Sequence, residues 1–328
     1  MLISKTPFRI SLVGGGTDLP GFFENHPEGG SVVSFPIKKY IYISINKLFQ
    51  DKGFILKYSK LEKLKTADDI KHRIIKAVFN KYDISGVDFN SVGDFPAKTG
   101  MGSSSAFTVG ILHCVRAYLG LQNNQVELGK EACEIELDIL NEPIGLQDQY
   151  GVALGGIKHI SFRADRQVDI RNIQLTDRQV EELSKNLVLF FIGNQRSASD
   201  ILSVQSKKTT SNHATKLTLI KMKELADNLA ESITNDIQSV GSYLHENWIL
   251  KRTLTQEISS KTIDNMYEAA IKNGAIGGKL LGAGGGGFML FYCPKPYQSK
   301  LKKALYKLQE YPIEIDTLGT RLISTDTI

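Results

Sequence analysis

The chain has 328 residues, of which 41% are hydrophobic and 23% are charged, so it can bury the core of one large or two medium-sized domains. Its formal net charge of +5 suits small anionic substrates but is too diffuse for a nucleic-acid-binding protein, which concentrates basic residues on one face or arm. The three cysteines form no CxxC pair, and no segment resembles a signal peptide or a membrane span of ~20 apolar residues. We therefore expect a cytoplasmic protein without a disulfide framework, a structural zinc site or a membrane anchor.

The first half of the chain mixes strand and helix patterns. Residues 2–12 and 39–48 alternate with period two, which predicts two half-buried strands. Residues 68–82 place apolar side chains on one helical face behind an acidic first turn, which predicts a helix. The other elements expected in this half are a strand at 87–93, a helix ending near Gly120, a helix over 125–141 and a strand over 157–162.

The second half is richer in helix. The expected elements are a helix near 176–185, a strand over 186–193, a long polar helical region over 197–250, a helix over 258–272, two strands flanking a glycine run at 282–287, a helix over 298–309 and a strand over 312–318. Hairpin-like neighbours outnumber βαβ units, which favours an α+β fold over a doubly wound sheet. No linker marks a boundary, and we divide the chain into an N-terminal lobe at 1–175 and a C-terminal lobe at 176–328.

The central motif follows the predicted strand at 87–93. It consists of Pro96 followed by Gly100, Gly102 and the consecutive serines Ser103, Ser104 and Ser105. Glycines let the backbone approach a ligand, and the free amides and dipole at a helix start attract an anion. A serine N-cap would explain one serine but not three, so the motif predicts a phosphate site. It is not a Walker A loop, because no Gly-Lys-Ser/Thr closes it.

Two other glycine segments give weaker signals. The run at 282–287 fits GxGxxG, but a strand follows it where a dinucleotide-binding unit requires a helix, so a tight β-turn is the alternative. The segment 14–18 directly follows a strand, and its Asp18 either binds sugar hydroxyls or forms an Asx-turn.

Together, and in this order, the three segments resemble the motifs of the GHMP kinase family. TPFRISLVGGGTD at 6–18 is similar to the first family motif, the serine loop to the second and KLLGAGGGGF at 279–288 to the third, so the resemblance spans most of the chain. Within the family, the first motif, GLQDQ at 145–149 and GNQRSASDIL at 193–202 most resemble the D-glycero-D-manno-heptose 7-phosphate kinases. The resemblance implies a two-lobed α+β fold, with an N-terminal lobe like domain 2 of ribosomal protein S5, a ferredoxin-like C-terminal lobe and an active site between them.

The resemblance also implies catalytic and metal-binding residues. Asp148 matches the catalytic aspartate, and the Pro/Gly break before it predicts a loop position. Arg9 matches the basic residue that keeps this carboxylate ionised and stabilises developing charge. A surface turn and a structural ion pair are the alternatives for the two residues. Glu136 matches a magnesium-binding glutamate with Ser104 as the second ligand, although a solvent-facing helix charge remains the alternative.

The remaining contacts follow from the same resemblance. The sugar should meet Gly16, Thr17 and Asp18, and the nucleotide phosphates should meet Gly284, Gly285 and Gly286. A substrate phosphate also needs a cation, for which the candidates are Lys38, Lys39, Arg163 and Arg196. Arg196 is the first choice because arginine binds phosphate bidentately.

We therefore expect an ATP- and Mg²⁺-dependent kinase for a small-molecule sugar phosphate. The expected reaction phosphorylates the C1 hydroxyl of D-glycero-D-manno-heptose 7-phosphate to the 1,7-bisphosphate, for nucleotide-activated heptose and surface polysaccharide. One alternative is another sugar kinase of this fold, acting on fucose, galactose or free heptose. The other is a non-catalytic sugar and ATP sensor, against which the presence of Asp148, Arg9 and Ser104 argues. The sequence makes no prediction of oligomeric state.

Overall fold

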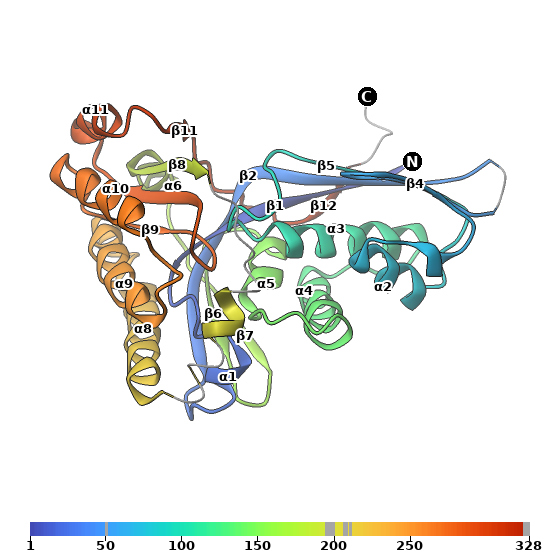
Figure 1. The fold of residues 1–328 in the computed structure, drawn as a ribbon, viewed down its shortest axis with the longest axis horizontal. Helices are drawn as coiled ribbons and strands as arrows, with labels where there is room; N and C mark the ends of the chain where they lie inside the picture. Colours follow the sequence, from blue (N-terminus) through green and yellow to red (C-terminus); the bar gives the residue numbers. More distant parts are fainter. Residues whose placement is uncertain (50–51, 194–200, 206–208, 210–211, 324–328) are drawn as a thin grey trace.

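The computed structural model describes residues 1–49, 52–193, 201–205, 209 and 212–323, and it contains two β-sheets with helices packed against them (Figure 1). The predicted α+β class is confirmed. No helix in the described part of the chain is both long and apolar enough to cross a membrane.

The first sheet has eight strands. They are β1 (Leu2–Val13), β2 (Gly30–Lys47), β3 (Phe54–Lys57), β4 (Leu61–Leu64), β5 (Val87–Gly93), β6 (Lys158–Phe162), β7 (Val168–Asn172) and β12 (Arg321–Ile323). Their order is β12-β1-β2-β5-β3-β4, with β6 beside β2 and β7 beside β6. The pairings are antiparallel except for β3 with β5.

The long pair β1–β2 forms the centre of this sheet. Its register runs from Leu2 opposite Ile45 to Val13 opposite Val33, with shifts next to Pro7 and Ser11. The expected second strand at 39–48 is confirmed, but β2 begins much earlier, at residue 30. Residues 30–37 are all buried, so they lack the alternation by which a half-buried strand is recognised.

Helices cover one face of the first sheet (Figure 1). The helical elements of this half are α1 (Pro20–Phe23), the 3₁₀-helix η1 (Ala67–Asp69), α2 (Arg73–Lys81), α3 (Ser103–Tyr118), α4 (Gln125–Cys133), the π-helix η2 (Glu134–Ile139) and α5 (Gln147–Ala153). The most buried is α3, which packs against β1 and β2 through apolar residues such as Val109 and Leu112. This burial fixes the position of the serine loop from which α3 begins.

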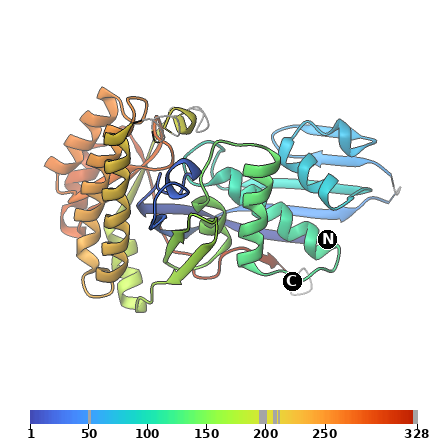
Figure 2. The ribbon, with the colours of Figure 1, turned by 90° about the horizontal axis from the view of Figure 1, so that it is seen from below.

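The second sheet has four strands in the order β11-β8-β10-β9, and helices stack outside it (Figures 1 and 2). Its strands are β8 (Leu187–Gly193), β9 (Gly277–Leu280), β10 (Gly287–Tyr292) and β11 (Gln309–Tyr311). The helical elements of this half are α6 (Asp177–Asn186), α8 (His213–Ser232), the 3₁₀-helix η3 (Ile237–Ser239), α9 (Val240–Leu254), α10 (Lys261–Lys272) and α11 (Lys295–Ala304).

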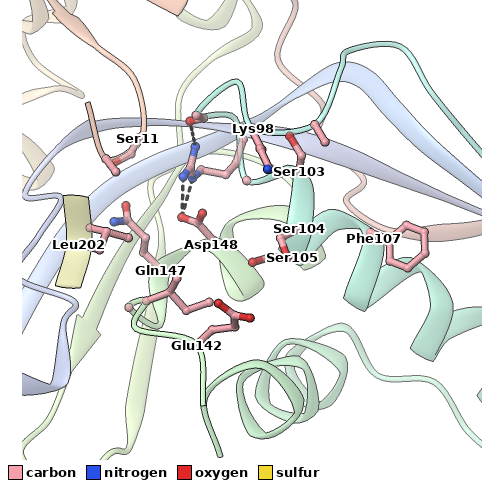
Figure 3. Close-up of a pocket in the computed structure, with 18 of the residues that line it drawn as sticks. Ser11, Lys98, Ser103, Ser104, Ser105, Phe107, Glu142, Gln147, Asp148 and Leu202 are labelled. Carbon is pink, nitrogen blue, oxygen red and sulfur yellow. Dashed lines mark hydrogen bonds and ion pairs between the residues drawn. The ribbon is translucent and has the colours of Figure 1, made fainter. Parts of the chain in front are cut away.

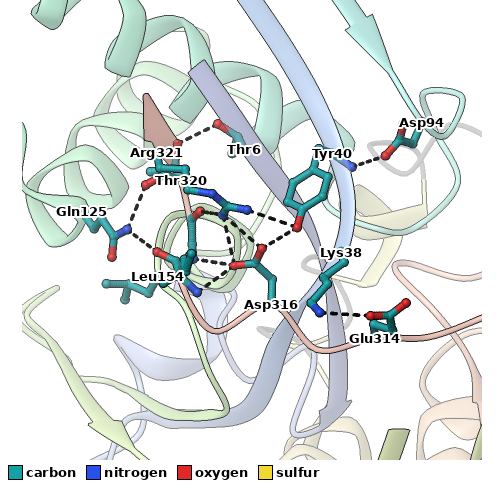
Figure 4. Close-up of polar contacts among 12 residues, drawn as sticks. Thr6, Lys38, Tyr40, Asp94, Gln125, Leu154, Glu314, Asp316, Thr320 and Arg321 are labelled. Atoms are coloured by element: carbon teal, nitrogen blue, oxygen red, sulfur yellow. Dashed lines mark hydrogen bonds and ion pairs between the residues drawn. The ribbon is translucent and has the colours of Figure 1, made fainter. Parts of the chain in front are cut away.

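The end of the chain returns to the first sheet. The strand predicted over 312–318 is wrong: these residues form a connection, with one bridge from Ile315 to Ile37, between β11 and β12. Asp316 anchors the connection because its carboxylate accepts hydrogen bonds from Tyr40 Oη (2.7 Å) and from the Gly319 amide (2.7 Å) (Figure 4). The division at 175/176 therefore separates the two sheets except for β12, and it remains a prediction.

Three predicted helices differ from the observed ones. The helix over 68–82 is divided into η1 and α2, because the backbone at Ile70 is extended and buries that side chain. The helix over 125–141 changes to a π-helix after residue 133, which turns Glu136 inward. In the described part of the polar region 197–250, α8 and α9 are separate helices, since Asp236 caps the turn between them.

Candidate active site

A cavity of about 480 Å³ lies where the two sheets meet. It is lined by the end of β1 and the glycine turn after it, the serine loop, the start of α5, and parts of α9, β9 and the third glycine turn. Figure 3 shows Ser103, Ser104 and Ser105 at the start of α3 near Asp148 and Gln147 at the start of α5. All three glycine segments identified in the sequence therefore reach one cavity.

Arg9 and Asp148 form an ion pair in this cavity. Arg9 is 3% exposed, and its Nε and Nη2 donate to Asp148 Oδ1 at 2.9 and 2.6 Å, while its Nη1 donates to the Gly100 carbonyl at 2.7 Å. Asp148 retains 28% side-chain exposure, and no described residue donates to its Oδ2. The guanidinium thus orients the carboxylate and leaves one oxygen free to accept a proton. Asp148 lies in the first turn of α5 rather than on the predicted loop, because the helix begins directly after the Gly145 break.

The serine loop and the third glycine turn pack backbone against backbone. Both Gly100 (φ +80°) and Gly102 (φ +72°) have left-handed conformations that favour glycine. A Cβ on Gly100 would lie 2.5 Å from the Leu281 carbonyl oxygen, and one on Gly282 would lie 2.4 Å from Gly100 Cα. The two motifs therefore form a single junction at which backbone amides and the start of α3 face the cavity.

Parts of the predicted phosphate contacts need correction. Within the third glycine turn, the cavity is lined by Gly282 and Ala283, not by Gly284, Gly285 and Gly286. The last three shape the turn: Gly285 N donates to the Ile258 carbonyl at 3.0 Å, and a Cβ on Gly284 would lie 2.7 Å from Ile258 Cα. Pro96 does not line the cavity either, whereas its neighbours Phe95, Ala97 and Lys98 do.

Glu136 lies at the base of the serine loop. Its Oε1 accepts from Ser104 Oγ (2.8 Å) and Thr108 Oγ1 (2.9 Å), and its Oε2 accepts from Ser105 Oγ (2.8 Å) and Gln149 Nε2 (2.7 Å). The side chain is fully buried, so the alternative of a solvent-facing helix charge is wrong. Burial raises the pKa of this carboxyl, and the four hydrogen bonds oppose that shift.

Ser104 and Glu136 can supply two of the oxygen ligands that Mg²⁺ requires. A hydroxyl and a carboxylate oxygen 2.8 Å apart are hard oxygen ligands. In the described part of the chain, however, no group of three His, Cys, Asp or Glu residues could hold a metal. The pair is therefore suited to an ion that obtains most of its ligands from phosphate oxygens and water.

The first glycine segment presents an aspartate to the cavity. Asp18 Oδ1 accepts from Gly16 N and from Gln147 Nε2, both at 2.8 Å, and Asp18 lines the cavity. Gly16 precedes Asp18, so this hydrogen bond is not the Asx-turn that was the alternative. Burial and then the nearby Asp148 raise the pKa of Asp18. Gly16 also lines the cavity, but Thr17 does not. The buried hydroxyl of Thr17 lies 2.8 Å from the carbonyl oxygens of Gly14 and Ser31, so its sugar contact gains no support from the geometry and stays a prediction.

Two lysines of the cavity wall were missed by the sequence analysis. Lys251 on α9 is 4% exposed and donates to the Gly282 carbonyl, and Lys279 on β9 is 1% exposed and donates to the carbonyls of Ser11 (2.8 Å) and Leu12 (3.0 Å). Burial, and then the charge of Arg9, lower the pKa of Lys251 to about 8. Lys279 opens the KLLGAGGGGF motif and could have been considered, whereas Lys251 lies in a polar helix where nothing distinguishes it from solvent-facing lysines.

Three of the four predicted cations for a substrate phosphate lie outside the cavity lining. Lys38 pairs with Glu314 at 3.0 Å and Arg163 with Asp165 at 3.2 Å. Neither of them lines the cavity, and Lys39 does not line it. Arg196 lies outside the described residues.

A helix start suited to an anion, an acidic residue held by arginine and a nearby lysine lie together in one cavity, an arrangement that suits phosphoryl transfer to a small molecule. Residues 69–156 match the GHMP kinases N terminal domain and residues 224–313 match the GHMP kinases C terminal domain. The chain is 30% identical to a D-glycero-alpha-D-manno-heptose 7-phosphate kinase of Campylobacter jejuni subsp. jejuni serotype O:2, over 94% of each chain. The chain belongs to the GHMP kinase family, as its motifs predict.

Solved structures share the fold. A D-glycero-D-manno-heptose 1-phosphate kinase from Bacteriodes thetaiotaomicron has a TM-score of 0.79 and 22% identity, over 99% of each chain. A putative sugar kinase from Campylobacter jejuni has a TM-score of 0.74 and 27% identity, over 98% of each chain. The two-lobed GHMP kinase fold is thereby confirmed.

Proposed function

We propose that this kinase transfers the γ-phosphoryl group of ATP to the C1 hydroxyl of D-glycero-D-manno-heptose 7-phosphate, giving the 1,7-bisphosphate. The observation that carries the proposal is the arginine-held Asp148, with one free oxygen, beside the serine loop in a single cavity. The 30% identity to the Campylobacter jejuni relative supports the choice of acceptor.

Asp148 acts on the acceptor. The C1 hydroxyl lies against Oδ2 and gives its proton to that oxygen as its own oxygen attacks the γ-phosphorus. The bond between the γ-phosphorus and the β,γ-bridging oxygen breaks, and ADP leaves with the electron pair. The proton on Asp148 then passes to water. Arg9 keeps Asp148 aligned throughout, because both of its bonds go to Oδ1.

The nucleotide extends from the junction of the two glycine motifs toward β5. The amides at the start of α3 supply donors for its phosphates, and so does the buried Ser103 Oγ, which has no partner among the described residues. The far arm of the cavity is lined by apolar and aromatic side chains that suit a purine, namely Ile74, Val92, Phe95 and Phe107.

Ser104 and Glu136 are the residues that would hold Mg²⁺, together with the phosphate oxygens. When bound, the ion would neutralise charge on the β- and γ-phosphates. Thr108 donates to Glu136 Oε1 at 2.9 Å and would help to keep the carboxylate in place beside Ser104.

The acceptor occupies the other end of the cavity. Asp18 and Gln147 face this end, and Gln205 contributes a buried Nε2 that has no partner in the described part of the chain. These groups suit the hydroxyls of a sugar. We place Arg196 at the substrate phosphate, as the sequence predicts. The product would enter the synthesis of nucleotide-activated heptose for surface polysaccharide, and we place the enzyme in the cytoplasm, where ATP is available.

A coupled ADP-release assay over a panel of sugars and sugar 7-phosphates tests the proposal, with Asp148→Asn as the inactive control. Release with heptose 7-phosphate alone is the expected result. Release with a free hexose or free heptose would assign the protein to another sugar kinase of this fold. No release with any sugar, combined with measurable sugar and ATP binding, would assign it to the sensor alternative.

A further inference from the structure

Lys251 is a buried cation whose hydrogen-bonding capacity is mostly unused. An ammonium group has three N–H donors, and in the described part of the chain only the Gly282 carbonyl accepts from Lys251. Lys158 provides the contrast within the same protein. It is also buried, but it donates to the carbonyls of Leu154 (2.7 Å), Gly155 (3.3 Å) and Gly156 (2.9 Å), as a purely structural lysine does. Lys251 instead lines the cavity with two donors to spare.

Lys251 lies closer to the proposed phosphate site than to the far end of the sugar site. Gly282, whose carbonyl accepts a hydrogen bond from Lys251, packs directly against Gly100, and the Gly100 carbonyl accepts from Arg9 Nη1 at 2.7 Å. Lys251 and Arg9 thus approach the junction of the two glycine motifs from different elements, α9 and β1. Asp148 is bonded to Arg9 at the same place.

Three cationic side chains and two anionic ones meet at this wall of the cavity. Arg9, Lys251 and Lys279 are all buried at this wall, and their mutual repulsion contributes to lowering the pKa of both lysines. The facing anions are Asp148, which Arg9 engages, and Asp18, which Gly16 and Gln147 engage. Buried like charges are unfavourable unless an anion joins them, and a phosphoryl group has several oxygens with which to do so.

We propose that Lys251 is a further catalytic residue: it binds the γ-phosphoryl group from the side of α9 and stabilises that group during transfer. The inference rests on the proposed kinase activity. As the bond to the β,γ-bridging oxygen breaks, charge spreads over the γ-phosphoryl oxygens, and a desolvated ammonium fixed by Gly282 is placed to meet it.

Nucleotide binding tests the inference without any sugar. Isothermal titration should give the Kd of wild type and Lys251→Met for Mg·ADP and for the non-hydrolysable Mg·AMP-PNP, which carries the γ-phosphoryl group. We expect Lys251→Met to weaken AMP-PNP binding by about 10- to 100-fold, the range for losing a charge-assisted hydrogen bond, and ADP binding by less than about twofold. Lys251→Arg should preserve most of the preference for AMP-PNP, because it keeps the charge.

The controls separate a specific role from general damage. Lys158→Met makes the same substitution at a buried lysine outside the cavity lining. It should lower the melting temperature without changing the ratio of the Kd values for ADP and AMP-PNP. If Lys251→Met does not fold, the ratio of the two Kd values is measured instead with Lys251→Gln, which should lose the preference for AMP-PNP, and with Lys251→Arg, which should keep most of it. An equal loss for both nucleotides, or no loss for either, would overturn the inference. If the wild type bound neither nucleotide, the kinase proposal itself would fail.

Discussion

Two carboxylates of the site, Glu136 and Asp148, differ in how they are held. Glu136 is fully buried, and four neutral donors occupy both of its oxygens. Asp148 is partly exposed, and one arginine holds a single oxygen. The first arrangement builds a rigid base for the serine loop, and the second leaves an oxygen available for chemistry. The comparison indicates that the number and charge of the hydrogen-bond donors, rather than burial alone, distinguish a carboxylate that supports the loop, such as Glu136, from one proposed to react, such as Asp148.

The largest effect is expected for Asp148→Asn, which removes the proton acceptor but keeps the size of the side chain. We expect turnover to fall by at least about 10³-fold, since general bases contribute up to about 10⁴-fold. Because we propose that the nucleotide phosphates contact the serine loop and not Asp148, the Kd for AMP-PNP should change little. ADP release and calorimetry measure the two quantities. Residual turnover above about a tenth of wild type would remove Asp148 from its proposed role.

Glu136→Gln should act on stability and metal use together. An amide cannot accept all four hydrogen bonds, so we expect the free energy of unfolding to fall by about 1–3 kcal/mol. The Mg²⁺ concentration for half-maximal activity should rise at least about tenfold. Chemical denaturation and magnesium titration measure these changes. An unchanged magnesium requirement in a folded variant would limit Glu136 to supporting the serine loop.

The pH dependence of kcat/KM for ATP tests the cation Lys251, as the variants above test the two carboxylates. Lys251 has a pKa of about 8 and faces Arg9, Lys279, Asp18 and Asp148. It carries its charge below this pH and loses it above, so kcat/KM for ATP should fall above about pH 8, approaching tenfold per pH unit. Lys251→Arg stays charged and should shift this descent to higher pH. An identical profile for wild type and the arginine variant would assign the descent to another group.

The smallest effect is expected at the glycine junction. Gly282→Ala places a Cβ 2.4 Å from Gly100 Cα, so we expect a loss of about 1–3 kcal/mol in stability and a several-fold increase in KM for ATP. Gly120→Ala is the matched control, because Gly120 has the same φ of +69° but no atom within 4 Å of its Cβ. Equal stability losses in the two variants would show that backbone strain, not the close approach of the motifs, determines the effect.

Local chemistry in the sequence predicted the serine loop, because glycines followed by consecutive serines stand out along the chain. Arg9 and Asp148 were expected only through the resemblance to the GHMP kinases, since a structural ion pair for Arg9 and a surface turn for Asp148 explain the residues alone. The alternating part of β2 was found, but its buried first eight residues were not, since alternation disappears where both faces are covered.

What the sequence did not predict depends on tertiary contacts. Thr17 was expected at the sugar from the family resemblance, but its hydroxyl lies against the carbonyls of Gly14 and Ser31. The choice between Gly282 and Gly284 within one glycine run depends on which of them meets Gly100. Lys251 reaches the cavity only because α9 packs beside β9, a contact with no signature in a polar helical stretch.

Transfer of label from [γ-³²P]ATP to D-glycero-D-manno-heptose 7-phosphate, with the product identified by ³¹P NMR, tests the central claim most directly. The account predicts labelled sugar bisphosphate carrying a new phosphate on C1 with wild type, and none with Asp148→Asn. Labelled inorganic phosphate alone, or label on another hydroxyl of the sugar, would contradict it.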